Sequence, residues 1–437
     1  MAETLTVYLP PTIQLFNSMK VFKFGGASVN NIERIKNLPA IIEPYKGQSV
    51  VIIISAMGKT TNALEKVAEA FFDNRKDDAL KLFDVIKQSH LNTAKYLLVT
   101  SYNKTLEDLV NIFTEVEWLL HDKPVQSFDY YYDQIVCVGE LLSTAIVSAY
   151  LNECGFPNQW LDVRDYLRTD DTFRDANVDY KITLENLRTS PIKNDGGIYI
   201  TQGFIGATDE NESTTLGREG SDYTAAIFAN LFDAESLTIW KDVAGVMSAD
   251  PKEYPEATHL KELSFNEVIE MSFYGAQVIH PKTIKPLQNK KIPLLVQSFI
   301  NPNEIGTIVS NKPVKDLPPI IVMKKNQALL HLRSHDFSFV GEQPMSLLYR
   351  IFSEVKVTPN LIQSGAISVQ VCLDDNEEKI SQLASAASEC FDVVVEKNLS
   401  LLTIRHYNED LLSLMIAGIE VVQMQKTKET VQVLFKN

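Results

Sequence analysis

The chain has 437 residues, of which 45% are hydrophobic and 22% are charged, as in ordinary globular proteins of two or three domains. Its formal net charge of −15 argues against nucleic-acid binding, which requires a clustered basic surface. The four cysteines form no C-x-x-C pair, so we expect no disulfide framework and a cytoplasmic location. The longest apolar run, Val50–Ile54, is too short to cross a membrane. Residues 1–18 lack the features of a secretory signal and are predicted to be a loose N-terminal extension.

Strand-like and helix-like segments alternate from residue 20 onwards. We expect strands at 20–24, 50–54, 160–163, 197–201 and 236–240, and helices at 31–42, 63–72, 137–151 and 221–231. Residues 75–122 show helical periodicity and are predicted to be an all-helical insertion. This alternation predicts a mostly parallel sheet covered by helices, which is an α/β fold.

The pattern changes beyond a proline cluster at residues 301–320. Strand, helix, strand, strand, helix and strand follow one another between 320 and 397, which is the ferredoxin-like order. A second, shorter copy is expected between 399 and 435, without a closing helix and with 301–319 as a candidate contribution. We therefore predict two small α+β modules after the α/β domain.

The stretch Lys23-Phe24-Gly25-Gly26 lies between the end of the first strand and the start of a helix. Glycines let a backbone approach a ligand closely, and a lysine beside a helix N-terminus favours a phosphate group. The alternative is a tight turn with a surface lysine. Gly58-Lys59-Thr60 is similar to the end of a P-loop, but the required first glycine would fall at Ile53, so the P-loop pattern fails.

Other polar side chains lie near expected strand ends and helix starts. Ser55 and Thr61 follow the second strand, where α/β folds bind ligands, although Thr61 is equally suited to capping a helix. Arg218, in a glycine-rich turn, is suited to holding a carboxylate bidentately, and Asp222 is either a helix cap or an active-site acceptor. Glu140 lies on a largely apolar helix, where a carboxylate should be paired or functional unless it is partly exposed.

Seven blocks, taken in chain order, resemble the aspartate kinase family. They are Lys23–Val29, Ser55-Ala56 with Thr61-Asn62, Gly139-Glu140, Thr201–Gly206, Thr214–Asp222, Asp242–Met247 with Asp250-Pro251, and Gly275–Pro281. The match spans about residues 20–310. It implies an amino-acid-kinase αβα sandwich followed by ferredoxin-like ACT regulatory domains, in agreement with the elements expected above.

The resemblance also implies domain limits. They are an extension at 1–18, a catalytic domain at 19–305 with the helical insertion at about 75–122, a first ACT domain with its linker at 306–398, and a shortened second ACT domain at 399–437. Because ACT domains of the family dimerise, a homodimer is implied. The length leaves no room for a fused homoserine dehydrogenase, so we expect a monofunctional enzyme.

The implied reaction moves the γ-phosphoryl group of ATP to the side-chain carboxylate of L-aspartate, giving 4-phospho-L-aspartate, the first step toward lysine, threonine and methionine. That carboxylate has an ordinary pKa of about 3.9, so it is already ionised and no general base is needed. Positioning and charge neutralisation then dominate.

The resemblance assigns a role to each matching residue. Lys23 would neutralise the transferring phosphoryl group, and Asp222 would orient Lys23. Arg218 would hold the α-carboxylate of aspartate and Glu140 its ammonium, supported by Ser55, Thr61 and Ser221. Gly25, Gly26 and Ser28 would line the phosphates of ATP, and Asp242, Gly245 and Lys252 would face the nucleotide. Mg²⁺ would be carried by ATP. No histidine has neighbouring residues in the sequence that suggest a metal site, so no metal site made by the protein is predicted.

Three positions depart from the common family pattern. Glu219 replaces a frequent glycine, Lys241 a frequent threonine, and Gln277 a frequent basic residue near the nucleotide. We interpret these as retuning rather than loss of activity. Two alternatives stay open: a catalytically silent amino-acid sensor on the same fold, and a kinase for another acidic amino acid such as glutamate or N-acetylglutamate. Lysine is the first candidate for a feedback effector and threonine the second, with Asn360 expected to face it.

Overall fold

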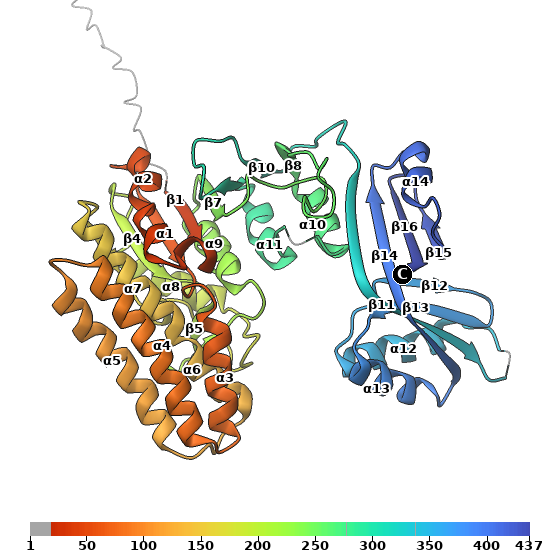
Figure 1. Cartoon of the computed structure of the whole chain (residues 1–437), viewed down its shortest axis with the longest axis horizontal. Coiled ribbons are helices and arrows are strands. Elements are labelled where there is room, and N and C mark those ends of the chain that lie inside the picture. The colour runs from red at the N-terminus through yellow and green to blue at the C-terminus, as the bar shows by residue number, and fades with distance from the viewer. Residues whose placement is uncertain (1–18, 277, 337) are drawn as a thin grey trace, which may run out of the picture. The chain divides into compact units, whose positions relative to one another are not determined.

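The computed structural model describes residues 19–276, 278–336 and 338–437, which fall into two units (Figure 1). The first unit holds the residues up to Val246 together with 261–265 and 279–312. The second holds 247–260, 266–278 and 313–437. The predicted extension at 1–18 and Gln277 lie outside the described residues.

An eight-stranded sheet forms the centre of the first unit. Its strands run in the order β3 (Asn158–Trp160), β4 (Ile198–Gln202), β2 (Val50–Ile54), β1 (Lys20–Phe24), β7 (Ser236–Lys241), β9 (Leu294–Ser298), β10 (Thr307–Ser310) and β8 (Glu262–Ser264). All neighbours from β3 to β9 are parallel, whereas β10 is antiparallel to β9. A separate hairpin joins β5 (Ile205–Ala207) and β6 (Ser213–Thr215). The predicted mostly parallel α/β sheet is therefore confirmed.

Two helices pack on one face of this sheet. They are α9 (Gly220–Leu231), against β1, β2 and β7, and α7 (Val138–Glu153), against β2, β3 and β4. On the other face Phe22 and Phe24 contact Trp240. Because side chains alternate along a strand, Lys23 points to the same face as α9. The first unit also contains α1 (Ile32–Lys36), α2 (Leu38–Ile42), α8 (Tyr180–Thr189) and α11 (Pro281–Lys290), whereas α10 (Phe265–Phe273) belongs to the second unit from residue 266 onwards.

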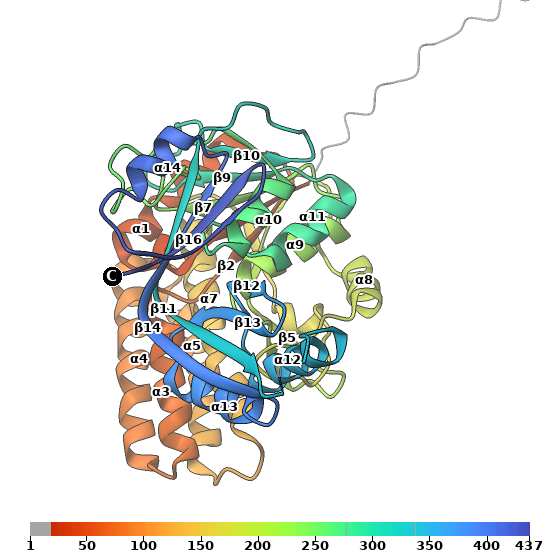
Figure 2. The same ribbon diagram turned by 90° about the vertical axis from the view of Figure 1, so that its right-hand side faces the viewer.

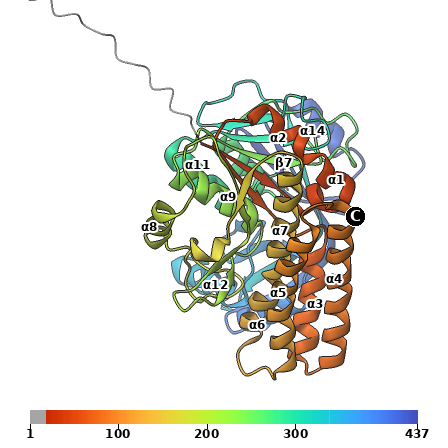
Figure 3. The same ribbon diagram turned by 90° about the vertical axis from the view of Figure 1, so that its left-hand side faces the viewer.

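A bundle of long helices stands beside the sheet (Figure 3). It consists of α3 (Thr60–Phe72), α4 (Lys76–Leu97), α5 (Tyr102–His121) and α6 (Phe128–Val136), with α7 packed against α5. The helices α4 and α5 are the predicted helical insertion. The stretch Phe128–Glu153 is long and apolar enough to cross a membrane, but 78% of its most apolar window is buried, as in the core helix of a globular protein.

Two local predictions differ from the structure. The strand expected at 160–163 ends at Trp160, because the side chain of Asp162 accepts the N–H of Arg164 and caps a 3-10 turn at Val163–Asp165. The helix expected at 31–42 is broken at Asn37, since Pro39 cannot donate the hydrogen bond that would continue it.

A six-stranded antiparallel sheet organises the second unit (Figure 2). Its order is β12 (Leu361–Ser364), β13 (Ser368–Asp374), β11 (Ile320–Ser334), β14 (Phe391–Arg405), β16 (Thr430–Lys436) and β15 (Val421–Lys426). The helices that pack on this sheet are α12 (Glu342–Val355), α13 (Glu377–Ala387) and α14 (Glu409–Met415). Side chains of α12 and α13 form one core with β11 and β13, and side chains of α14 form another with β14 and β16.

The central strands β11 and β14 each have 15 residues and serve both predicted modules. Each contains an asparagine with positive φ near its middle, Asn326 at 55° and Asn398 at 60°, and the β11–β14 register is interrupted beside Asn326. Residues 320–324 pair with 401–405, so they complete the second module, rather than 301–319. The domain limits at 305/306 and 398/399 stay predictions.

Candidate active site

Lys23 and Asp222 form a short ion pair at the centre of the first unit. The Nζ of Lys23 lies 2.6 Å from Oδ1 of Asp222, and the two side chains are only 12% and 5% exposed. Lys23 is next to the last residue of β1, and Asp222 is in the first turn of α9, which packs on β1. The fold thus holds one cation close to the carboxyl end of a central parallel strand, where α/β proteins bind ligands.

The same strand ends border a cavity of about 550 Å³. It contains most of the residues predicted to meet substrate: Lys23, Gly26, Ser55, Thr61, Glu140, Arg218, Ser221 and Asp222. Parallel register explains the convergence, because Lys23 lies opposite Ile53 of β2 and Ile239 of β7. Ser55 and Lys241 lie two residues beyond Ile53 and Ile239, so their side chains point to the same face of the sheet as Lys23. Both residues line the cavity.

Close backbone contact shapes the cavity at Gly203. A Cβ atom built on Gly203 would lie 2.5 Å from Cβ of Ser221 and 2.7 Å from its Cα. Only glycine therefore allows the turn after β4 to approach the start of α9 this closely. This contact lies beside Phe204 and Ser221, which line the cavity.

Glu140 is a buried carboxylate with one oxygen unused. Its Oε1 accepts the N–H of Ala56 at 3.3 Å, and its Oε2 has no hydrogen-bond partner among the described residues. Burial on the apolar helix α7 raises the pKa of Glu140 to about 8. A buried acceptor without a partner, lining a cavity, is suited to receiving a cationic group of a ligand.

Arg218 and Glu219 lie side by side at the entrance to α9. Arg218 is exposed and makes no hydrogen bond or ion pair within the part of the chain that the structure describes. Glu219 has a left-handed backbone with φ of 54°, which explains why a glycine is frequent there. Oε2 of Glu219 accepts the N–H of His280 at 3.2 Å, so its carboxylate has a partner other than Arg218.

Sequence patterns missed Asp133, which organises one wall of the site. Its carboxylate accepts three hydrogen bonds: from the N–H of Arg174 at 2.9 Å, and from the N–H and hydroxyl of Thr215 at 2.8 and 2.7 Å. Arg174 and Thr215 both line the cavity, as does Tyr132. Burial raises the pKa of Asp133 to about 6 despite these hydrogen bonds. No local motif marks Asp133, because its partners lie 41 and 82 residues away.

The predicted nucleotide residues are less closely gathered. Gly25, Asp242 and Gly245 do not line the cavity, and Ser28 is buried with its hydroxyl donating to the carbonyl of Trp240 at 3.3 Å. Lys252 belongs to the second unit. Gln277 cannot be placed, since it lies outside the described residues.

The described residues contain no group of three His, Cys, Asp or Glu side chains arranged to hold a metal ion. Asp222, the carboxylate beside Lys23, is already paired with that lysine.

Comparison with protein families gives a match to the amino acid kinase family over residues 18–298. The chain is 32% identical to lysine-sensitive aspartokinase 3 of Escherichia coli (strain K12), over 81% of this chain and 78% of that protein. It is 31% identical to the chloroplastic aspartokinase 1 of Arabidopsis thaliana, over 82% of this chain but only 63% of that protein. The chain thus spans less than two thirds of the plant relative.

Solved structures show the same fold along nearly the whole chain. E. coli aspartokinase III in complex with aspartate and ADP (R-state) superposes with a TM-score of 0.78 at 26% identity, covering 96% of both chains. The complex of E. coli aspartokinase III with lysine and aspartate (T-state) gives 0.77 at 27% identity, covering 95% of both. These matches confirm the predicted αβα sandwich followed by ACT domains.

Proposed function

This chain belongs to the amino acid kinase family and, within it, to the aspartokinases, and on that premise we propose that it transfers the γ-phosphoryl group of ATP to the side-chain carboxylate of L-aspartate. The observation that carries the proposal is one cavity that holds the Lys23–Asp222 pair together with Oε2 of Glu140 and the side chain of Arg218, which have no partner among the described residues. A free amino acid presents both an ammonium and an α-carboxylate. The two groups are therefore complementary to the ends of the substrate.

The chemistry requires positioning more than proton transfer. The acceptor carboxylate is ionised at neutral pH, so the barrier comes from bringing one anion to another. Lys23 neutralises charge on the transferring phosphoryl group, and Asp222 holds the Lys23 ammonium at 2.6 Å. The product is 4-phospho-L-aspartate, an intermediate toward lysine, threonine and methionine.

The substrate is held at its other end by groups around the same cavity. Arg218 binds the α-carboxylate through its planar donor pair, and Oε2 of Glu140 accepts the ammonium. Ser55, Thr61 and Ser221, which also line the cavity, add hydroxyl groups. A cationic ligand group favours the ionised form of Glu140, so its binding releases the proton that burial retains.

The nucleotide binds with its phosphates toward Lys23. Gly25 joins β1 to the 3-10 helix Gly26–Val29, which contains Gly26 and Ser28, and a Cβ on Gly26 would meet the carbonyl oxygen of Ala56 at 2.7 Å. We assign Asp242, Gly245 and Lys252 to the nucleotide as expectations from the family pattern. Mg²⁺ enters with ATP and supplies neutralisation of phosphate charge. The E. coli relative solved with ADP supports use of this nucleotide pair.

Regulation by lysine is the favoured proposal for the second unit, with threonine as the second candidate. The E. coli relative is named lysine-sensitive and has been solved with lysine. In this chain Oδ1 of Asn360 accepts the Nζ of Lys324 at 2.6 Å, and Nδ2 donates to Gln327 and Asp374. Asn360 therefore already accepts from a lysine ammonium, the group that a lysine effector would offer in its place.

Assembly and location complete the proposal. A homodimer through the ACT domains follows from the family resemblance, and the second unit has an open sheet edge at β12 and another at β15. A cytoplasmic location agrees with the four cysteines, all of which are free.

An ADP-release assay with L-aspartate, L-glutamate and N-acetylglutamate, each with ATP and Mg²⁺, tests the function. We expect turnover with aspartate, and a fall of about a hundredfold or more in Lys23→Met, because one preorganised charge is lost. Lys20→Met is the matched control, since Lys20 lies on the same strand and pairs with Glu235 instead. Turnover with another acid alone would overturn the substrate. An inactive wild type, indistinguishable from Lys23→Met, would favour the silent sensor. Inhibition curves with lysine and threonine then test the effector.

A further inference from the structure

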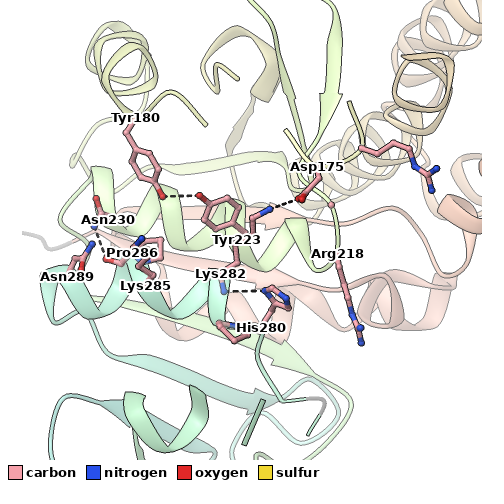
Figure 4. A pocket seen from close by; sticks show the side chains of 13 residues that line it. Asp175, Tyr180, Arg218, Tyr223, Asn230, His280, Lys282, Lys285, Pro286 and Asn289 are labelled. Atoms are coloured by element: carbon pink, nitrogen blue, oxygen red, sulfur yellow. Dashed lines mark hydrogen bonds and ion pairs between the residues drawn. The ribbon is translucent and has the colours of Figure 1, made fainter. Parts of the chain in front are cut away.

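A second cavity of the first unit, of about 1000 Å³, lies next to the candidate active site and is larger than it (Figure 4). It lies among α8, α9 and α11 and the loops at 174–175 and 217–218. Arg174, Gly217 and Arg218 line both cavities. The proposed reaction gives the α8 and α11 walls no role, so this space needs its own explanation.

The cavity is strongly cationic. Four cationic side chains line it, Arg174, Arg218, Lys282 and Lys285, against a single carboxylate, Asp175. That carboxylate is already paired, because Lys282 Nζ lies 2.6 Å from its Oδ1. In a chain with a net charge of −15, such a concentration of positive charge in one hollow favours an anionic ligand.

Two of these cations are available to a ligand. Neither the side chain of Lys285 nor that of Arg218 has a hydrogen bond, an ion pair or an aromatic contact with any residue in the described ranges. Figure 4 shows them on opposite sides of Tyr223 and Lys282. A ligand that reaches both must carry anionic groups at two separate places.

The wall between these cations offers neutral donors. The hydroxyl oxygens of Tyr180 and Tyr223 are 3.2 Å apart, so one donates to the other and the second hydroxyl keeps a hydrogen for a ligand. Burial raises the pKa of Tyr180, which keeps it protonated. Lys282 Nζ lies 5.5 Å from the ring centre of Tyr223, which fixes this part of the wall.

We propose that this cavity is a second ligand site, for a small polyanion that carries two or more carboxylate or phosphate groups. Because Arg218 lines both cavities, an occupant that binds Arg218 weakens the binding of aspartate, and aspartate weakens the occupant equally. This coupling rests on the proposed function, whereas the site itself does not.

Isothermal titration of the full chain, without nucleotide or Mg²⁺, tests the site with two probes, tricarballylate for carboxylates and inorganic pyrophosphate for phosphates. We expect saturable binding of at least one, weakened about tenfold or more by Lys285→Glu and less by Lys285→Ala. Lys81→Glu, an equal charge reversal at an exposed helical position on α4, should change affinity less than about twofold. Lys23→Met should also bind normally, since Lys23 lines only the smaller cavity.

Three results would overturn the site: no saturable binding of either probe, equal losses in Lys285→Glu and Lys81→Glu, or loss in Lys23→Met with retention in Lys285→Glu. The last would mean that the anion binds in the active site. The probe that binds identifies the anionic group. Binding here is measured without turnover, so a failure to phosphorylate aspartate leaves the outcome unchanged. Addition of aspartate should lower the probe's affinity about fivefold or more, and no change would overturn the coupling.

Discussion

Replacing Glu140 by Gln is expected to stabilise the first unit at neutral pH while weakening the binding of aspartate. Burial raises the pKa of Glu140 from an ordinary 4.5 to about 8, so at pH 7 the carboxyl is ionised in the unfolded chain and protonated in the folded one. Each pH unit between 4.5 and 7 makes folding less favourable by about 1.4 kcal/mol, which amounts to about 3 kcal/mol. The contribution of Glu140 to the stability of the fold is therefore fully present below its pKa in the unfolded chain. It is lost as the pH rises through its pKa in the folded protein. Glutamine cannot ionise and has no such dependence.

Thermal unfolding of wild type and Glu140→Gln between pH 5 and pH 8 measures this difference. The wild type should lose about 3 kcal/mol relative to the variant over that range. Aspartate binding at pH 7 should release about one proton from the wild type and none from the variant, measured by titration calorimetry in buffers of different ionisation enthalpy. The aspartate KM of the variant should rise roughly ten- to hundredfold, because a charge-assisted hydrogen bond is lost. Parallel stability curves, with no proton release, would refute the reasoning.

Three further substitutions test other parts of the site. Gly203→Ala should destabilise the fold by roughly 1–3 kcal/mol in thermal unfolding and lower kcat/KM, because its Cβ would lie 2.5 Å from that of Ser221; wild-type values would contradict the packing argument. Glu219→Gly should raise stability by roughly 1 kcal/mol by relieving its left-handed backbone, and a loss would mean that the bond to the backbone of His280 outweighs the strain. The wild-type KM for aspartate should rise as the pH falls through about 6, where Asp133 gains its proton, and Asp133→Asn should lack this step in a pH profile; an unchanged step would assign it elsewhere.

The position of Lys23 and Ser55 around one cavity was predictable because it follows from strand order. Lys23 and Ser55 sit at the ends of apolar strands, and parallel pairing brings such ends to one edge of a sheet. Glu140 and Arg218 were candidates from the sequence pattern, and the resemblance gave them roles. That Oε2 of Glu140 and the side chain of Arg218 have no partner among the described residues was not predictable, because it depends on how distant segments pack. Asp133 was missed because its bonds to Thr215 cross 82 residues of chain.

The C-terminal modules show the same limit. Their elements were predicted nearly in place, yet β11 was expected to serve the first copy alone, and β14 was expected as two strands, 391–397 and 399–406, one in each copy. A periodic pattern shows that a segment is a strand, but the partner of that strand is decided by packing. Asn326 and Asn398 adopt the positive φ that lets each strand continue from one module into the other. A single asparagine in a sequence does not predict this role.

The shared strands also constrain the order in which the chain can fold as it is synthesised. Ile320–Lys324 emerge before the first module, but their partners at 401–405 emerge after it, and 430–436 must then cover the exposed side of 399–405. The second module therefore cannot close until residues 430–436 have left the ribosome. A chain cut near 398 would keep a complete set of strands for the first module, yet it would leave 320–324 as an unpaired edge open to other chains.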